Sequence, residues 1–193
     1  MTAEHGARID HYSVAQWREL ARRYPQRKRA LILSSTASAA VHGLGGWLFD
    51  QNSAGWDVTV LVGSRGDEPA LAILGAHVLD IDAIDDIRTT EATVTTVAIG
   101  STLYTDDAHV RALPEADTRG PDQARTLFFG YAPPADLADT VTATTHRISI
   151  AARAFKAQAL KSIGGPTIEP AATVETAWDR DRQPLDAFSV ATG

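Results

Sequence analysis

Hydroxyl-bearing side chains stand where the first predicted strand meets the first long predicted helix. Ser35 and Thr36 follow the apolar run of residues 30–34, and either of them can cap the helix that begins next. The amide groups and the dipole at the start of a helix favour an anion, and small hydroxylated side chains add hydrogen-bond donors. Two interpretations stay open at this point of the chain: simple helix capping, or a phosphate-binding site.

A similar change from apolar to polar residues follows the other predicted strands. Arg65, which comes after the second strand, suits a ligand phosphate, although the glycines on both sides of it are equally typical of an exposed turn. The candidate ligand-binding residues taken from the strand ends are Ser35, Thr36, Ser64, Arg65, Asp80, Ser101 and Thr102.

An acidic cluster follows the third predicted strand and comprises Asp80, Asp82, Asp85 and Asp86. Carboxylates at this spacing can hold Mg²⁺ against a phosphate or act as a general base. The simpler interpretation is that Asp82 caps a short helix and the other carboxylates face solvent. We favour the simpler interpretation because no second class of metal ligand stands nearby in the sequence.

Several reaction chemistries have no support in the sequence. The chain has no cysteine, which excludes disulfides, thiolate metal sites and cysteine nucleophiles. Its six histidines form no H-E-x-x-H motif, and the elbow G-x-S-x-G, the dinucleotide fingerprint G-x-G-x-x-G and the P-loop are missing. We therefore assign no metal site, no cofactor and no catalytic residue from the sequence, and leave open whether the protein is an enzyme.

The elements that must position these residues alternate between strand and helix. Apolar and β-branched runs predict five strands, at residues 30–34, 57–62, 77–81, 93–99 and 126–130. Helices are predicted at residues 13–24, from 36 to about 51, at 69–74, and from 134 to about 163. This alternation predicts a three-layer α/β fold, Rossmann-like or flavodoxin-like, whose mostly parallel sheet of about five strands has helices on both faces. Ligands of such sheets bind beyond the carboxyl ends of the strands, where the candidate residues stand.

One domain is predicted over residues 1–163, and it begins with a basic helix. Residues 1–29 carry seven basic and three acidic side chains, whereas residues 164–193 carry two arginines and five carboxylates. Hydrophobic periodicity ends after Gly164, so residues 164–193 are predicted to be an acidic, mobile tail that contributes little to the core.

Length and composition bound the class of protein. A chain of 193 residues is long enough for one substantial core, and 44% hydrophobic with 22% charged residues is a globular composition. The net charge of −6 disfavours nucleic acid as a partner. Residues 30–49 carry no full charge and follow a basic cluster, as a signal anchor does, but their many serines, alanines and glycines favour a strand, a turn and a helix. We therefore predict a cytoplasmic protein without a membrane segment.

Two functional hypotheses follow. In the first, a small Rossmann-like domain binds a nucleotide or another phosphorylated small molecule at the carboxyl ends of its strands. In the second, a non-catalytic regulatory or assembly protein has the fold without the ligand and acts through a protein partner or as a homodimer. The hydroxyl-rich strand ends favour the first hypothesis, and the missing glycine motifs favour the second.

Overall fold

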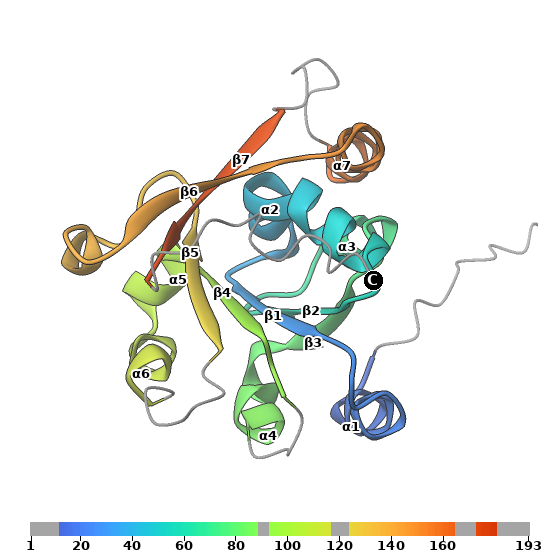
Figure 1. Ribbon diagram of the computed structural model, residues 1–193, viewed down its shortest axis with the longest axis horizontal. Helices are drawn as coiled ribbons and strands as arrows, with labels where there is room; N and C mark the ends of the chain where they lie inside the picture. The colour runs from blue at the N-terminus through green and yellow to red at the C-terminus, as the bar shows by residue number, and fades with distance from the viewer. Residues whose placement is uncertain (1–11, 89–92, 117–123, 165–172, 181–193) are drawn as a thin grey trace, which may run out of the picture.

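A single seven-stranded sheet forms the centre of the molecule (Figure 1). The computed structural model describes residues 12–88, 93–116, 124–164 and 173–180. The order of the strands across the sheet is β3-β2-β1-β4-β5-β7-β6. The strands are β1 (Arg29–Ser34), β2 (Asp57–Val62), β3 (His77–Asp80), β4 (Thr96–Gly100), β5 (Arg125–Phe129), β6 (Thr142–Arg147) and β7 (Val174–Asp179).

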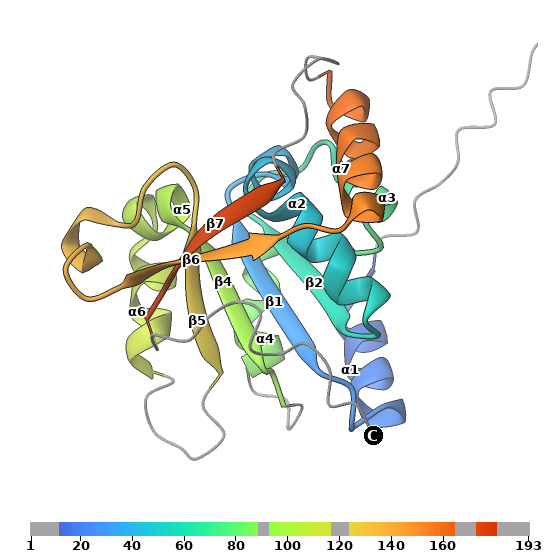
Figure 2. The same ribbon diagram turned by 45° about the horizontal axis from the view of Figure 1, so that its top comes forward.

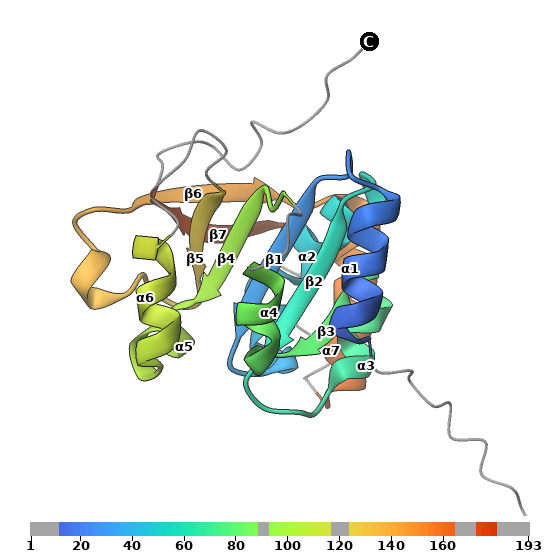
Figure 3. The same ribbon diagram turned by 90° about the horizontal axis from the view of Figure 1, so that it is seen from below.

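Helices cover both faces of this sheet and give the molecule three layers (Figures 1 and 3). One face is covered by α2 (Ala37–Ser53) and α3 (Glu68–Ile73), and α7 (Ile150–Ser162) packs against both of these helices. The opposite face is covered by α1 (Val14–Arg23), α4 (Ile84–Arg88), α5 (Ser101–Asp106) and α6 (Ala108–Ala116). Two short 3₁₀ helices, η1 (Ile81–Ala83) and η2 (Ala135–Leu137), lie in the connections. Of the helices in the described ranges, none has the length and apolarity needed to cross a membrane.

The strands β1 to β5 are all parallel, and the strand order reverses direction between β1 and β4. Leu33 of β1 is in register with Leu61 of β2 and with Ile99 of β4. Every residue of β1 and β2 is buried, because helices cover both faces of the sheet. The predicted three-layer α/β class, its mostly parallel sheet and its five strands are confirmed, with strand ends shifted by a few residues.

The prediction of about five strands in total is wrong, because the sheet contains seven. Both missed strands are antiparallel to their neighbours: β7 pairs with β5, and β6 pairs with β7. β6 lies in the first half of the stretch predicted as one long helix, of which only α7 forms. Burial alternates along β6, and its β-branched residues Thr142, Thr144 and Thr145 fit a half-buried strand better than a helix.

β7 lies inside the segment predicted as a mobile tail. It is an inner strand between β5 and β6, and its residues Glu175, Ala177 and Asp179 are buried. Residues 174–179 therefore contribute to the core, contrary to the expectation for this segment. A single six-residue strand with alternating burial carries too short a pattern to stand out among the surrounding polar residues.

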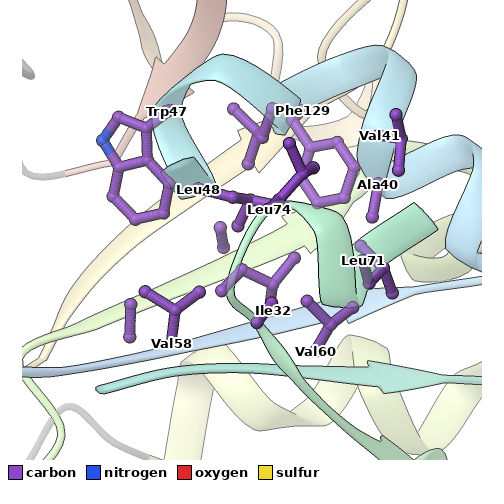
Figure 4. Close-up of a cluster of buried hydrophobic side chains, with 14 of the residues drawn as sticks. Ile32, Ala40, Val41, Trp47, Leu48, Val58, Val60, Leu71, Leu74 and Phe129 are labelled. Carbon is purple, nitrogen blue, oxygen red and sulfur yellow. The ribbon is translucent and has the colours of Figure 1, made fainter. Parts of the chain in front are cut away.

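Hydrophobic clusters hold the helices to both faces of the sheet. On the face of α2 and α3, Ile32, Val58 and Val60 of the central strands pack beneath Leu71 and Leu74 (Figure 4). The face that α2 turns toward the sheet is a stripe of fully buried residues at helical spacing: Ala37, Ala40, Val41, Leu44 and Leu48.

α2 approaches its neighbours closely at two glycines. A Cβ atom on Gly43 would lie 2.6 Å from the ring of Phe129, and one on Gly46 would collide with the side chain of Ile148. Any larger residue would push α2 away from β5 and from the segment that follows β6. These glycines therefore set how deeply α2 sits on the sheet.

A buried ion pair joins α2, α7 and β7. Glu175 of β7 accepts hydrogen bonds from the Gly46 and Trp47 amides at 2.7 and 2.8 Å, and from Lys156 Nζ of α7 at 2.6 Å. Lys156 Nζ also donates to the His42 carbonyl at 2.8 Å, the carbonyl that the Gly46 amide would bond in a regular helix. Side chains from two other elements thus insert into the hydrogen-bond ladder of α2, and their mutual bonds are what allow both charges to be buried.

We expect Glu175→Gln to lower the free energy of unfolding by about 3–5 kcal/mol, because the substitution leaves the Lys156 ammonium buried without an opposite charge. Urea unfolding followed by circular dichroism measures this loss. The matched control is Asp86→Asn, since Asp86 pairs with Arg18 at 3.4 Å on the surface, where such a pair contributes about 1 kcal/mol or less. Identical unfolding curves for wild type and Glu175→Gln would contradict this role.

Candidate functional site

The candidate site lies where the neighbouring strands β1 and β4 both end. The chain leaves β1 toward α2 on one face of the sheet and leaves β4 toward α5 on the other, and both helices begin at the same edge (Figure 2). Open α/β sheets bind their ligands where neighbouring connections diverge in this way. The residues after β1 lie on one side of this point, and Ser101 and Thr102 lie on the other.

Two hydroxyl groups at this edge serve the local fold. Ser34 Oγ donates to the Thr36 carbonyl at 2.8 Å, and Thr36 Oγ1 accepts from the Ala39 amide at 3.0 Å as the N-cap of α2. The capping interpretation of Thr36 is thereby confirmed. The Ser35 carbonyl accepts from the Ser64 amide at 2.9 Å, so the loops after β1 and β2 run side by side.

Arg65 and Asp80 lie together at the outer rim of this edge. Their side chains form an ion pair at 3.5 Å and are 55% and 43% exposed. Asp80 also accepts from the Asp82 amide at 3.3 Å and caps η1, a role that the sequence indicated for Asp82 instead. Because a carboxylate of the protein already faces Arg65, an anionic ligand would have to compete with it.

Ser101 differs from the other hydroxyls of the site. It is the first residue of α5, and its Oγ is buried without a hydrogen-bond partner among the described residues. A Cβ atom on Gly130, which follows β5, would lie 3.7 Å from Ser101 Oγ. A buried hydroxyl without a partner is unfavourable unless a ligand or water satisfies it. Thr102, the next residue, is exposed.

A histidine–carboxylate pair near this edge escaped sequence analysis. Nε2 of His109, in the first turn of α6, lies 3.3 Å from Asp85 Oδ1 in the first turn of α4. The start of each of these helices lies toward the edge where the parallel strands end (Figure 3). No local sequence motif predicts the pair, because the two residues belong to separate helices that only the fold brings together.

The acidic cluster that follows β3 is divided among separate partners. Asp80 faces Arg65, Asp85 faces His109, and Asp86 faces Arg18 of α1. Within the described parts of the chain, no group of three or more histidines and carboxylates could hold a metal ion. The carboxylates therefore do not converge on one point as a metal centre requires.

Comparison with known proteins shows a shared fold. No protein-family model matches the sequence, and no curated protein matches it. A deacetylase of the teicoplanin biosynthesis pathway matches with a TM-score of 0.58 at 14% identity, covering 79% of this chain and 97% of its own. The A40926 pseudoaglycone deacetylase has a TM-score of 0.54 at 19% identity, covering 80% and 97%. The 4-carboxy-2-hydroxymuconate hydratase of Pseudomonas putida KT2440 has a TM-score of 0.51 at 18% identity, covering 72% and 79%.

The functional prediction from the sequence is therefore corrected. The similar solved structures named above are deacetylases and a hydratase, and this finding runs against both the nucleotide-binding or phosphate-binding domain and the non-catalytic regulatory or assembly protein. The physical reason is visible at the site. Thr36 is occupied as a helix cap and Arg65 faces Asp80, so two of the groups assigned to a phosphate already have partners within the protein.

The effect of substitution on stability should distinguish the Thr36 hydroxyl, which caps a helix, from the Ser101 hydroxyl, which we expect to meet a ligand. Thr36→Ala removes the N-cap of α2, and we expect it to lower the free energy of unfolding by about 1 kcal/mol. Ser101→Ala should leave stability unchanged, because the Ser101 hydroxyl makes no hydrogen bond within the described structure. Chemical denaturation of both variants tests this, and a larger loss for Ser101→Ala than for Thr36→Ala would refute the assignment.

Proposed function

We propose that the protein is a hydrolytic enzyme that removes an acetyl group from an amine, with its substrate bound at the carboxyl ends of β1, β2 and β4. The similarity in fold to deacetylases supports this proposal, and in one case it covers 80% of the chain. The observation that carries it is the Ser101 hydroxyl, which is buried and unpartnered where such sheets bind ligands. A buried hydroxyl without a hydrogen bond among the described residues is a candidate to bond a ligand.

The proposed reaction is the hydrolysis of an amide, in which water adds to the acetyl carbon and the carbon–nitrogen bond breaks. His109, oriented by Asp85, would take the proton from water and return it to the departing amine, so that acetate and a free amine result. Ser101 Oγ would donate a hydrogen bond to the carbonyl oxygen as negative charge develops on it. The remaining candidate residues would surround the substrate: Ser35, Thr36, Ser64, Arg65, Asp80 and Thr102.

A structure of a teicoplanin deacetylase in a zinc-inhibited form is also similar to this chain. The described residues of the present chain do not fit a metal centre, since too few of their histidines and carboxylates converge. The proposed reaction therefore uses side chains of the chain itself in each step.

We further propose that the fold is Rossmann-like rather than flavodoxin-like. Its parallel strands have the order 3-2-1-4-5, whereas flavodoxin-like sheets have the order 2-1-3-4-5. Cytoplasmic location, and association as a homodimer or with a protein partner, stay part of the proposal.

The proposed activity can be tested with a panel of N-acetylated amines, including acetylated amino sugars and amino acids. Released acetate and free amine are measured for wild type, His109→Gln and Ser101→Ala. We expect kcat/KM to fall about 100-fold or more in each variant, since one loses the general base and the other a hydrogen bond to the developing oxyanion. Both variants should keep the melting temperature of wild type, because His109 is exposed and Ser101 Oγ is unpartnered.

His42→Gln is the matched control, since His42 is an exposed histidine of α2 that is not among the proposed site residues. It should retain the wild-type rate. Failure of the wild type to release acetate from any compound in the panel would overturn the proposed reaction. Full activity of His109→Gln would overturn the role given to His109.

A further inference from the structure

Buried polar atoms without partners gather on the sheet face beneath α1, at the amino-terminal ends of β1 and β2. Trp17 and Thr59 are 0% exposed, Arg29 is 1% exposed and Asp57 is 7% exposed. The unpartnered atoms are the Tyr12 hydroxyl, Trp17 Nε1, Arg29 Nε, Asp57 Oδ1 and Thr59 Oγ1, none of which has a hydrogen bond in the described structure.

The register of the strands explains why these atoms meet. Arg29 of β1 is opposite Asp57 of β2, and Thr59 lies two residues further along β2, so its side chain points to the same face. Arg29 Nε is 3.7 Å from Asp57 Oδ2, which is too far for a direct hydrogen bond. His77 of β3, in register with Thr59, brings its Nε2 to 3.9 Å from Asp57 Oδ1, again too far.

Tyr12, just before α1, and Trp17, within it, lie on the same face of the sheet. The Tyr12 ring stacks on the His77 imidazole with the ring centroids 4.1 Å apart, and Trp17 is on the buried face of α1. The terminal guanidinium nitrogens of Arg29 donate to backbone carbonyls at the end of α1 and just beyond it, at 2.6–3.2 Å. The Arg29 Nε–H alone remains without an acceptor within hydrogen-bond distance.

Burial shifts the pKa of three groups here. Desolvation is the main cause in each: it lowers the pKa of His77 and of Arg29, and it raises the pKa of the Tyr12 hydroxyl. His77 and Tyr12 are therefore neutral at neutral pH. The charges of Arg29 and Asp57 oppose each other, so the group as a whole requires no counter-ion.

We propose that ordered water occupies this place and hydrogen-bonds the unpartnered atoms, forming a buried hydration site between α1, β1 and β2. Water suits the chemistry of the group, which offers donors at Trp17 and Arg29, an acceptor at Asp57, and two hydroxyls that can do both. Left unsatisfied, the five atoms together would cost an amount comparable with the whole free energy of unfolding. The site lies at the opposite ends of the strands from the candidate functional site, so it does not depend on the proposed function.

The indole proton of Trp17 reports on this water directly. In the isotope-labelled full-length protein, we expect a rotating-frame Overhauser contact between bound water and the Trp17 Nε1–H, whose resonance is identified by its loss in Trp17→Phe. A crystal structure should show density of the size of water at the same place. An indole proton without a water contact overturns the proposal. Density larger than water would reveal a small organic molecule and overturn the assignment to water.

Thr59→Val gives a second test, in which the direction of the change in melting temperature decides the outcome. If water bonds the Thr59 hydroxyl, the variant should melt about 2–4 °C lower than wild type. If no water is present, the substitution removes only an unpartnered hydroxyl, and an unchanged or higher melting temperature overturns the proposal. Tyr12→Phe should also melt lower. Tyr24→Phe is its matched control and should melt as wild type does, because Tyr24 is not a member of this group.

Discussion

Glu175 brings together three segments that are far apart in the sequence. Its carboxylate bonds the middle of α2 and the ammonium of Lys156 in α7, while its backbone belongs to β7. A buried carboxylate is tolerated only while its partners remain in place, so these segments must fold as one unit. Gly43 and Gly46 add to this constraint, because they let α2 settle against Phe129 and Ile148. Since α2 begins directly after Thr36, these contacts also fix the position of this edge of the candidate site.

The two ends of the parallel strands hold polar groups in different states. At the amino-terminal ends, Arg29, Asp57 and Thr59 are buried beneath α1, where every polar atom needs a partner. At the carboxyl ends, ion pairs such as Arg65 with Asp80 are exposed to solvent and contribute little to stability. The amino-terminal ends are therefore enclosed in the fold, whereas the carboxyl ends remain open to solvent. The carboxyl end is free to vary in its side chains, as the binding edge of an open sheet must be.

Similarity in fold and similarity in site are separate matters in this protein. The overall fold is similar to that of solved deacetylase structures, yet the chemistry must come from side chains of this chain. There the hydroxyls divide into those that bond the backbone, as in Ser34 and Thr36, and the one at Ser101 that bonds nothing in the described structure. This division, rather than the number of polar residues, distinguishes a group that maintains the loop from one that can meet a ligand.

The sequence by itself determined the parallel strands of the sheet and the starts of α1, α2 and α3, to within a residue. The apolar runs at β1 and β2 and the caps at Ser13 and Thr36 act within a few residues, so they can be recognised locally. β6 and β7 escaped because each is short, alternates in burial and gains its stability from a partner strand distant in the chain. The site shows the same limit. Its candidate residues were found from the strand ends, but the pairing of His109 with Asp85 and the isolation of Ser101 beside Gly130 arise only from packing between separate elements.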